Sequence, residues 1–181
     1  MPTTKGDWLD CGLGILAEQG AQALRLDRLL ATIGLTKGSF YHHFDGMPDY
    51  RAELAAYFEE RYTTRYIDVA TERFEDPAGQ LRTLRSLVAA EKGAEAELEV
   101  AFRAWAQQDA VVRTVQERID ERRVRFLEEL FARHDLPSGR ARVLAQAVYL
   151  TLVGGGHVVP RAPIEEIERI WDLLLEPLGR P

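Results

Sequence analysis

The sequence LRLDRLLATIGLTKGSFYHHF, residues Leu24 to Phe44, is the most informative stretch of the chain. Its apolar residues recur at helical spacing on both sides of Gly34, which predicts one short helix over 26–33 and another over 36–44. Gly34 is able to take the positive φ that a sharp turn needs, and Thr36 is a typical N-cap residue. Two short helices joined at a glycine, the second rich in hydroxyl, basic and aromatic side chains, are the plan of a helix-turn-helix.

The side chains of this stretch divide into a packing set and an outward set. The packing set is spaced to hold the two helices together at their crossing point and consists of Leu29, Ile33, Leu35 and Phe40. The N-terminus of the second helix, capped by Thr36, offers free backbone N–H groups to a phosphate. The outward set is left to face a nucleic-acid groove and consists of Lys37, Ser39, Tyr41, His42 and His43.

The segment GLTKGSFYHHF, residues 34–44, resembles the TetR family of bacterial transcription regulators. It follows the family's pattern of Gly, apolar, Ser or Thr, Lys or Arg, Gly, Ser or Thr, apolar, Tyr, any residue, His and Phe nearly position by position. The first helix and the segment AFRAWAQQD at 101–109 also resemble members of this family. The likeness covers residues 5–58 well and the remainder mainly by its number of helices. A match over 11 residues is far more specific than a bare helix-turn-helix.

The resemblance implies an all-α protein with a helix-turn-helix DNA-binding domain over residues 1–46 and a helical effector-binding and dimerisation domain over residues 47–181. It implies that helix 36–44 enters the major groove, with Lys37, Gly38, Ser39 and His42 nearest the bases. Tyr41 and His43 would bind the phosphate backbone, together with the start of the preceding helix. The full DNA-contacting set that it implies is Arg25, Asp27, Thr36, Lys37, Gly38, Ser39, Tyr41, His42 and His43.

Three places depart from the family's pattern. Leu24 and Arg25 stand where the family opens its second helix with Ser or Thr, and we expect the long Arg25 side chain to replace that phosphate contact. Met47 stands where the family often has Lys at the start of its fourth helix, so we expect one phosphate contact to be lost. Leu30 occupies a position that the family keeps small, which we expect to shift the angle between the second and third helices.

Composition places the chain among globular proteins, whereas its charge gives no general support to DNA binding. With 46% hydrophobic and 29% charged residues, 181 residues are enough to bury a sizeable core. No apolar run approaches membrane-spanning length, no signal-peptide pattern opens the chain, and a single cysteine, Cys11, expected in a helix core, fits a cytoplasmic protein. The net charge is −6, and the first 50 residues hold four basic and six acidic side chains, a formal −2. Contacts to DNA must therefore come from local geometry.

Apolar residues recur with a period near 3.6 along the rest of the chain, and no stretch shows the sustained period of two that is typical of strands. Nine helices are predicted in all. Besides the two above, they are 5–19, 47–74, 78–91, 94–108, 110–134, 138–156 and 164–178.

The last two predicted helices each carry an apolar face that suits packing against other helices. One such pair from each of two subunits would form a four-helix interface, and we expect a homodimer. The same faces equally suit the core of a single subunit, which is the alternative. The residues expected at the interface are Leu144, Val148, Thr151, Gly155, Ile167, Trp171 and Leu174. The run Gly154–Gly156 is typical either of a close contact at that interface or of a frayed helix end.

An effector pocket is expected among the helices that follow residue 47. Aromatic side chains supply contact area with a few polar tips, and the candidates, for each of which core packing is the alternative, are Phe58, Tyr62, Tyr66, Phe102, Trp105 and Tyr149. The run ERIDERR at 117–123 is typical of a solvated helix face, although Arg122 and Arg123 would suit an acidic effector.

Motifs of other functional classes lack the surroundings that they need. Residues 12–17, GLGILA, formally match a dinucleotide fingerprint, but no strand precedes them, so helix packing is the better interpretation. No histidine has acidic or cysteine partners at ligand spacing, so no metal or cofactor is expected. The sequence offers no candidate pair of nucleophile and base, so an enzyme is not predicted. The predicted function is a dimeric TetR-type repressor released from DNA by a small molecule. The alternative is a small-molecule-binding or protein-interaction module that has lost operator binding.

Overall fold

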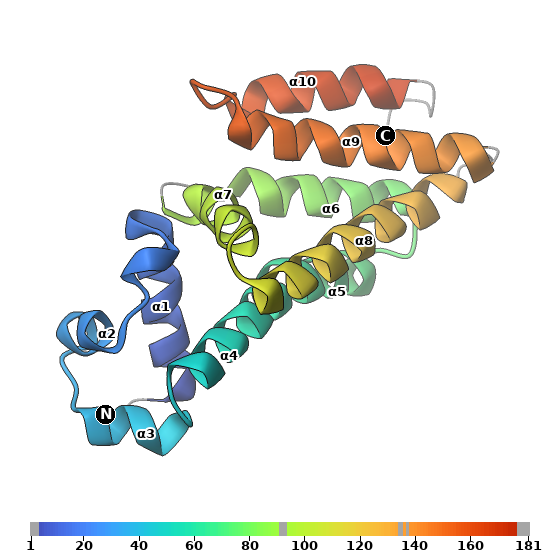
Figure 1. The fold of residues 1–181 in the computed structure, drawn as a ribbon. Helices are drawn as coiled ribbons and strands as arrows, with labels where there is room; N and C mark the ends of the chain where they lie inside the picture. The colour runs from blue at the N-terminus through green and yellow to red at the C-terminus, as the bar shows by residue number, and fades with distance from the viewer. Residues whose placement is uncertain (1–3, 91–93, 134–135, 137, 177–181) are drawn as a thin grey trace. The chain divides into compact units, whose positions relative to one another are not determined.

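The computed structural model describes residues 4–90, 94–133, 136 and 138–176. All regular structure in this part of the chain is helical, which confirms the predicted all-α class (Figure 1). The elements are, in chain order, α1 (Lys5–Gln19), η1 (Ala21–Ala23), α2 (Leu26–Ile33), α3 (Lys37–His43), α4 (Met47–Glu59), η2 (Glu60–Thr64), α5 (Arg65–Arg73), α6 (Pro77–Ala90), α7 (Ala94–Ala106), α8 (Ala110–Ala132), α9 (Ser138–His157) and α10 (Ile164–Leu175). None of the described helices is both long and apolar enough to cross a membrane.

Helix α1 begins and ends where the sequence predicts. Thr4 and Asp7 form a capping box, in which the Asp7 N–H donates to Thr4 Oγ1 at 3.2 Å and the Thr4 N–H donates to Asp7 Oδ2 at 2.7 Å. Gly20 ends the helix with a φ of 74°. One face of the helix is buried and consists of Trp8, Leu9, Gly12, Leu13, Ile15 and Leu16.

The predicted helix over 47–74 is interrupted by a π-turn. Helix α4 is followed by η2, the π-turn, and only then by α5. A π-turn uses i→i+5 hydrogen bonds over a few residues, so the apolar period changes too briefly for the sequence pattern to reveal it. The prediction of one uninterrupted α-helix is wrong here. The other predicted helices are present with small shifts of their ends, and the predicted end residues 91, 134 and 178 lie outside the described residues.

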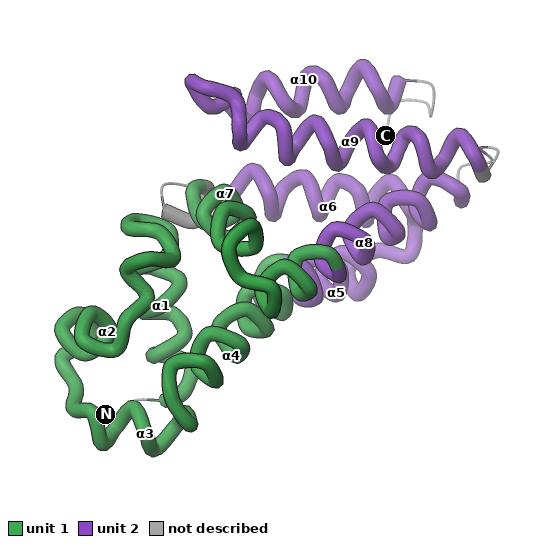
Figure 2. Tube along the Cα trace, viewed as in Figure 1, with its two compact units in different colours: residues 1–62, 92–117 green, residues 63–91, 118–181 purple. Residues whose placement is uncertain are grey.

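The chain forms two compact units, drawn in green and purple in Figure 2. Unit 1 comprises residues 1–62 and 92–117, and unit 2 comprises residues 63–91 and 118–181. Helices α1 to α4 thus belong to one unit with α7, which packs against α1. The predicted boundary between residues 46 and 47 concerns the division of function, and it stays a prediction.

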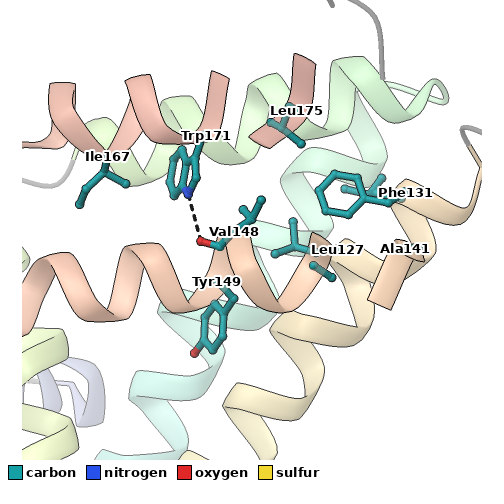
Figure 3. Close-up of a cluster of buried hydrophobic side chains, with 10 residues drawn as sticks. Leu127, Phe131, Ala141, Val148, Tyr149, Ile167, Trp171 and Leu175 are labelled. Atoms are coloured by element: carbon teal, nitrogen blue, oxygen red, sulfur yellow. Dashed lines mark hydrogen bonds between the residues drawn. The ribbon is translucent and has the colours of Figure 1, made fainter. Parts of the chain in front are cut away.

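The core of unit 2 lies between α8, α9 and α10 (Figure 3). Trp171 of α10 is buried against α9, and its indole N–H donates to the Val148 carbonyl at 3.0 Å. Gly155 lets these two helices approach closely, because a Cβ at this position would lie only 2.5 Å from Ile167 Cδ1. Within α9, Gly155 therefore makes a close helix–helix contact inside one chain and is not a frayed helix end.

This packing favours the alternative of core packing for most of the predicted interface residues. Val148, Ile167 and Trp171 are at most 5% exposed and belong to the core of unit 2. Leu144 and Leu174 pack against the same cluster, and the Thr151 hydroxyl donates to the Ala147 carbonyl of its own helix at 2.7 Å. The spacing of apolar residues identifies an apolar face but not the surface that covers it. Here the chain itself covers it.

Candidate nucleic-acid interface

The turn between α2 and α3 has the geometry of a helix-turn-helix. Gly34 ends α2 in the left-handed region, with φ 75° and ψ 27°, and its N–H donates to the Leu30 carbonyl at 2.9 Å. Thr36 caps α3 from an extended conformation, and its hydroxyl accepts from the Ser39 N–H at 3.4 Å. Both helices have the predicted bounds to within one residue at each end. The direction of α3 is therefore set by two local devices that the sequence specifies.

Four aromatic rings lie beneath α3 and fix its inward face. The Phe40 ring centroid is 5.5 Å from that of Trp8 on α1, 5.2 Å from Phe44 and 5.6 Å from Tyr50 on α4. The Tyr50 and Phe44 rings meet edge to face at 4.9 Å. All four side chains are at most 2% exposed. This cluster confirms the packing role predicted for Phe40 and adds Phe44 to the core, and it holds α3 by one side only.

The predicted base-facing and phosphate-facing side chains lie on the other side of α3. Lys37, Gly38, Tyr41 and His42 are exposed, while Ser39 and His43 are half-buried. Tyr41 is 57% exposed although it is a large aromatic residue. The His42 and His43 rings contact each other, with 5.0 Å between centroids. The structure thus brings the predicted α3 residues together on one short, outward-facing surface.

The start of α2 carries the other predicted contacts. Arg25 is the N-cap residue of α2 but makes no capping hydrogen bond with its side chain. Its guanidinium instead lies 3.7 Å from the Asp27 carboxylate, and both side chains are largely exposed. Met47 and Leu30, which depart from the family's pattern, are both half-buried. In the free protein the Asp27 carboxylate therefore lies beside the Arg25 side chain that is predicted to contact phosphate.

The local charge near α2 and α3 differs in sign from that of the whole chain. Residues 25–43 carry three cations, Arg25, Arg28 and Lys37, against the single carboxylate of Asp27, a formal +2. Several other carboxylates of the first 50 residues are engaged elsewhere in unit 1. Asp7 is in the capping box of α1, Asp10 accepts from Tyr57 at 2.9 Å and from Arg61, and Asp49 accepts from the Asp45 N–H at 3.0 Å.

The predicted pocket residues divide between the two units. In unit 1 the Phe58 and Phe102 rings are stacked 3.9 Å apart, and Tyr62 and Trp105 flank them, with ring centroids 5.2 Å from Phe58 and 5.8 Å from Phe102 respectively. Tyr66 and Tyr149 belong to unit 2, where the Tyr149 hydroxyl donates to Asp120 at 2.7 Å. Arg122 and Arg123 donate to the hydroxyls of Thr64 and Thr63 at 2.7 and 2.9 Å. Four of the six candidates therefore form one aromatic cluster, in which Phe58, Phe102 and Trp105 are buried core residues.

The described residues contain no group of three or more His, Cys, Asp or Glu side chains placed to hold a metal ion. Cys11 is half-buried, and burial raises the pKa of its thiol, against a smaller opposing effect of the Arg28 charge. A thiol held in its neutral form is a weak nucleophile, which agrees with a packing role. The GLGILA motif lies within α1, as expected for helix packing.

Two residues of α4 that the sequence analysis did not single out organise this unit. Tyr50 contacts α1 and α3, and Arg51 bonds to the backbone in front of α2 at 3.1 Å. The one available signal is Gly12, which lacks a side chain where α4 approaches α1. A pattern of apolar residues on α4 does not reveal which of them reach another helix through a polar atom.

Neither a protein-family model nor a curated protein matches the chain. Solved structures do match it over nearly its whole length. A TetR transcriptional regulator from Legionella pneumophila has 11% identity and a TM-score of 0.74, with 98% of this chain and 94% of that one covered. The reduced form of NemR from E. coli has 16% identity and a TM-score of 0.76, with 96% of each chain covered. The chain has the TetR fold. The α2–α3 pair is the helix-turn-helix of this fold.

Proposed function

We propose that this protein is a TetR-type regulator that binds a near-palindromic operator as a homodimer and is released by a small-molecule effector. The observation that carries the proposal is α3 itself. Its inward face is fixed by buried aromatic rings, while Lys37, Tyr41 and His42 extend from its outward face. Such an arrangement suits insertion into a major groove, where phosphate contacts orient the helix and base contacts give specificity.

The second copy is supported by an apolar surface on the last two helices. Val143 and Leu150, seven residues apart on α9, are each 64% exposed, and Leu173 of α10 is 72% exposed. Ile170, one turn before Leu173, is also exposed. Large apolar side chains in this number mark an interaction surface. A twofold dimer buries one such surface against its copy and presents two identical α3 helices to two half-sites.

The effector part of the proposal rests on an aromatic cluster in unit 1. Around Phe58 and Phe102, an apolar or aromatic small molecule would replace ring contacts of the same kind, because aromatic side chains supply contact area and few polar groups. Mass spectrometry of the purified protein would test for such a ligand. A repressor role follows the same proposal, because release by an effector is the simplest way in which ligand binding changes transcription.

Selection of bound fragments from genomic DNA tests the DNA-binding function directly. We expect enriched sites with dyad symmetry, and we expect a variant with both Lys37→Ala and Tyr41→Ala to enrich none. Enrichment of sites without any dyad would contradict the dimeric model. Failure of the wild type to retain any duplex at low salt would contradict DNA binding altogether.

A second candidate function is a ligand-binding or protein-interaction module without operator binding. The net charge of −6 and Met47 at the start of α4 favour it, because both remove attraction to phosphate. A shift assay at several salt concentrations separates the two candidates. A binding constant that falls steeply with salt supports the regulator, and the absence of any shift supports the module.

A further inference from the structure

Arg51 of α4 reaches the backbone immediately in front of α2. Its Nη2 donates to the Leu24 carbonyl at 3.1 Å. The side chain is half-buried, and its Nε is buried without a hydrogen-bond partner in the described part of the chain. A guanidinium kept in such a position has given up some of its hydration. The free-energy cost of this lost hydration has to be offset by the hydrogen bond that the guanidinium makes to the Leu24 carbonyl.

Apart from Arg51, the segment is kept in place by apolar packing, since the Leu24 and Leu29 side chains are fully buried. The N-cap residue of α2, Arg25, makes no capping bond, in contrast to Thr36 at the start of α3. Among the described residues, Arg51 is the one side chain that hydrogen-bonds to the main chain of the segment between Gly20 and Gly34. Backbone bonds complete the turn, with the Arg25 N–H donating to the Ala23 carbonyl at 2.8 Å. The Leu24 carbonyl is thus the point at which α2 is fixed to α4.

The neighbouring residue of α4 fixes the other two helices. The Tyr50 hydroxyl donates to the Trp8 carbonyl of α1 at 2.8 Å, and its ring lies against Phe40 in the middle of α3 and Phe44 at its C-cap. Tyr50 and Arg51 together therefore join α4 to α1, α2 and α3. The attachments to α1 and to the segment before α2 each use one hydrogen bond, whereas the attachment to α3 uses ring contacts.

We propose that Arg51 is the positioning residue for the phosphate contacts at the N-terminus of α2. It acts by holding the Leu24 carbonyl, which orients the Arg25 side chain and the free N–H groups of the first turn of α2. The guanidinium cannot accept from these N–H groups as a capping side chain would, so it fixes the backbone before α2 and leaves the N–H groups free for a phosphate. The expected effect on DNA binding rests on the proposed function. The contact between Arg51 and Leu24 lies within unit 1 and does not depend on it.

The test compares Arg51→Gln and Arg51→Lys with Arg25→Gln in binding to mixed-sequence genomic duplex DNA at several salt concentrations. A positioning residue leaves the number of phosphate contacts unchanged. We therefore expect Arg51→Gln to weaken binding by about tenfold with the wild-type salt slope. Arg25→Gln should instead lower the slope by about 0.9 per half-site. Arg51→Lys, which retains a donor, should recover part of the loss, and thermal unfolding should show that all three variants fold.

Binding by Arg51→Gln equal to that of the wild type would overturn the proposal. A salt slope lowered as in Arg25→Gln would also overturn it, because Arg51 would then contact a phosphate directly. Amide hydrogen exchange in the free protein gives an independent test. The Leu29 N–H, which donates to the Arg25 carbonyl at 3.0 Å, should exchange faster in Arg51→Gln, whereas the Phe44 N–H at the end of α3 should be unchanged. Unaltered exchange at Leu29 would refute the positioning role even if no DNA bound to the wild type.

Discussion

The hydroxyl of Tyr50 donates to the carbonyl oxygen of Trp8 at 2.8 Å, and it does so against Gly12. A Cβ at Gly12 would lie 1.9 Å from that hydroxyl oxygen, so α4 can approach α1 only because this residue has no side chain. Burial, and then the neighbouring Cys11, raises the pKa of Tyr50 far above its ordinary value. The hydroxyl therefore stays protonated and remains a donor. One glycine and one tyrosine set the separation of the two helices.

Tyr50→Phe and Gly12→Ala should destabilise unit 1 for different reasons. Loss of the hydroxyl removes one buried hydrogen bond and should cost about 1 kcal/mol. The added methyl at residue 12 overlaps the hydroxyl and should cost about 1–3 kcal/mol. In the Tyr50→Phe background the second cost should fall, because the overlapping atom is gone.

Denaturant unfolding of the two single variants and the double variant measures this coupling. Gly14→Ala is a matched control on the same helix, because nothing lies within 4 Å of a Cβ there. It should stabilise by about 0.5–1 kcal/mol, as expected for Gly to Ala in a helix. An equal cost for Gly12→Ala in both backgrounds would show that the tyrosine hydroxyl does not limit the approach of α4.

Leu150→Asp and Leu173→Asp should each convert the proposed dimer into a folded monomer, since charge replaces exposed apolar surface. Sedimentation at fixed protein concentration measures the assembly state, and circular dichroism checks the fold. Val111→Asp, at a side chain 57% exposed in unit 1, is the control and should stay dimeric. Trp171→Ala should instead destabilise the subunit by about 3–5 kcal/mol. A dimer that survives both charged substitutions would refute the proposed surface.

Tyr41→Phe and Lys37→Ala should separate orientation from base recognition on α3. Tyr41 is proposed to bind phosphate, so its loss should weaken all duplexes by a similar factor and leave the ranking of sites unchanged. Lys37 is proposed to face base edges, and Lys37→Ala should relax preference at one base pair by about 1–3 kcal/mol. Binding curves on a set of variant operators measure both effects. A changed site ranking in Tyr41→Phe with an intact ranking in Lys37→Ala would reverse the assignment.

The capping box of α1 should contribute a pH-dependent part of stability. The Thr4 backbone N–H, and then its hydroxyl, lower the pKa of Asp7 below its ordinary value of 3.8. A carboxylate with a lowered pKa stabilises the folded state at pH above its ordinary value, and this is lost as the pH falls through the lowered one. The stability difference between wild type and Asp7→Ala should therefore be constant near neutral pH and shrink below about pH 4. Glu18→Ala, at an exposed carboxylate of the same helix, is the control and should leave this acid response unchanged.

Local signals in the sequence were sufficient for α1, α2 and α3. Thr4 and Thr36 bond to the backbone three residues further on, and Gly20 and Gly34 act through their own φ. These effects are local and can be predicted without knowing the tertiary structure. The same holds for the outward set on α3, because Phe40 and Phe44 identify the opposite face as buried.

Features that depend on contacts between distant segments were not predictable in this way. The π-turn η2 changes the helical register for only a few residues, and the apolar spacing on α10 is the same whether α9 or a second subunit covers it. Arg51 bears a charge that suggests solvent or DNA, and nothing in its neighbours predicts a bond to Leu24. Each of these required the tertiary structure.

The distribution of tryptophan gives the chain built-in optical reporters. Trp8 is fully buried beneath α3, with its ring 5.5 Å from Phe40, and Trp171 is the single tryptophan of unit 2. When Trp105 and either Trp8 or Trp171 are replaced by Phe, a single tryptophan remains, and its fluorescence comes from one identified unit. The fluorescence of Trp8 alone then follows events at α3, and that of Trp171 alone follows unfolding of α9 and α10. The order in which the two units respond to denaturant, DNA or a ligand becomes measurable by light emission, with no label attached.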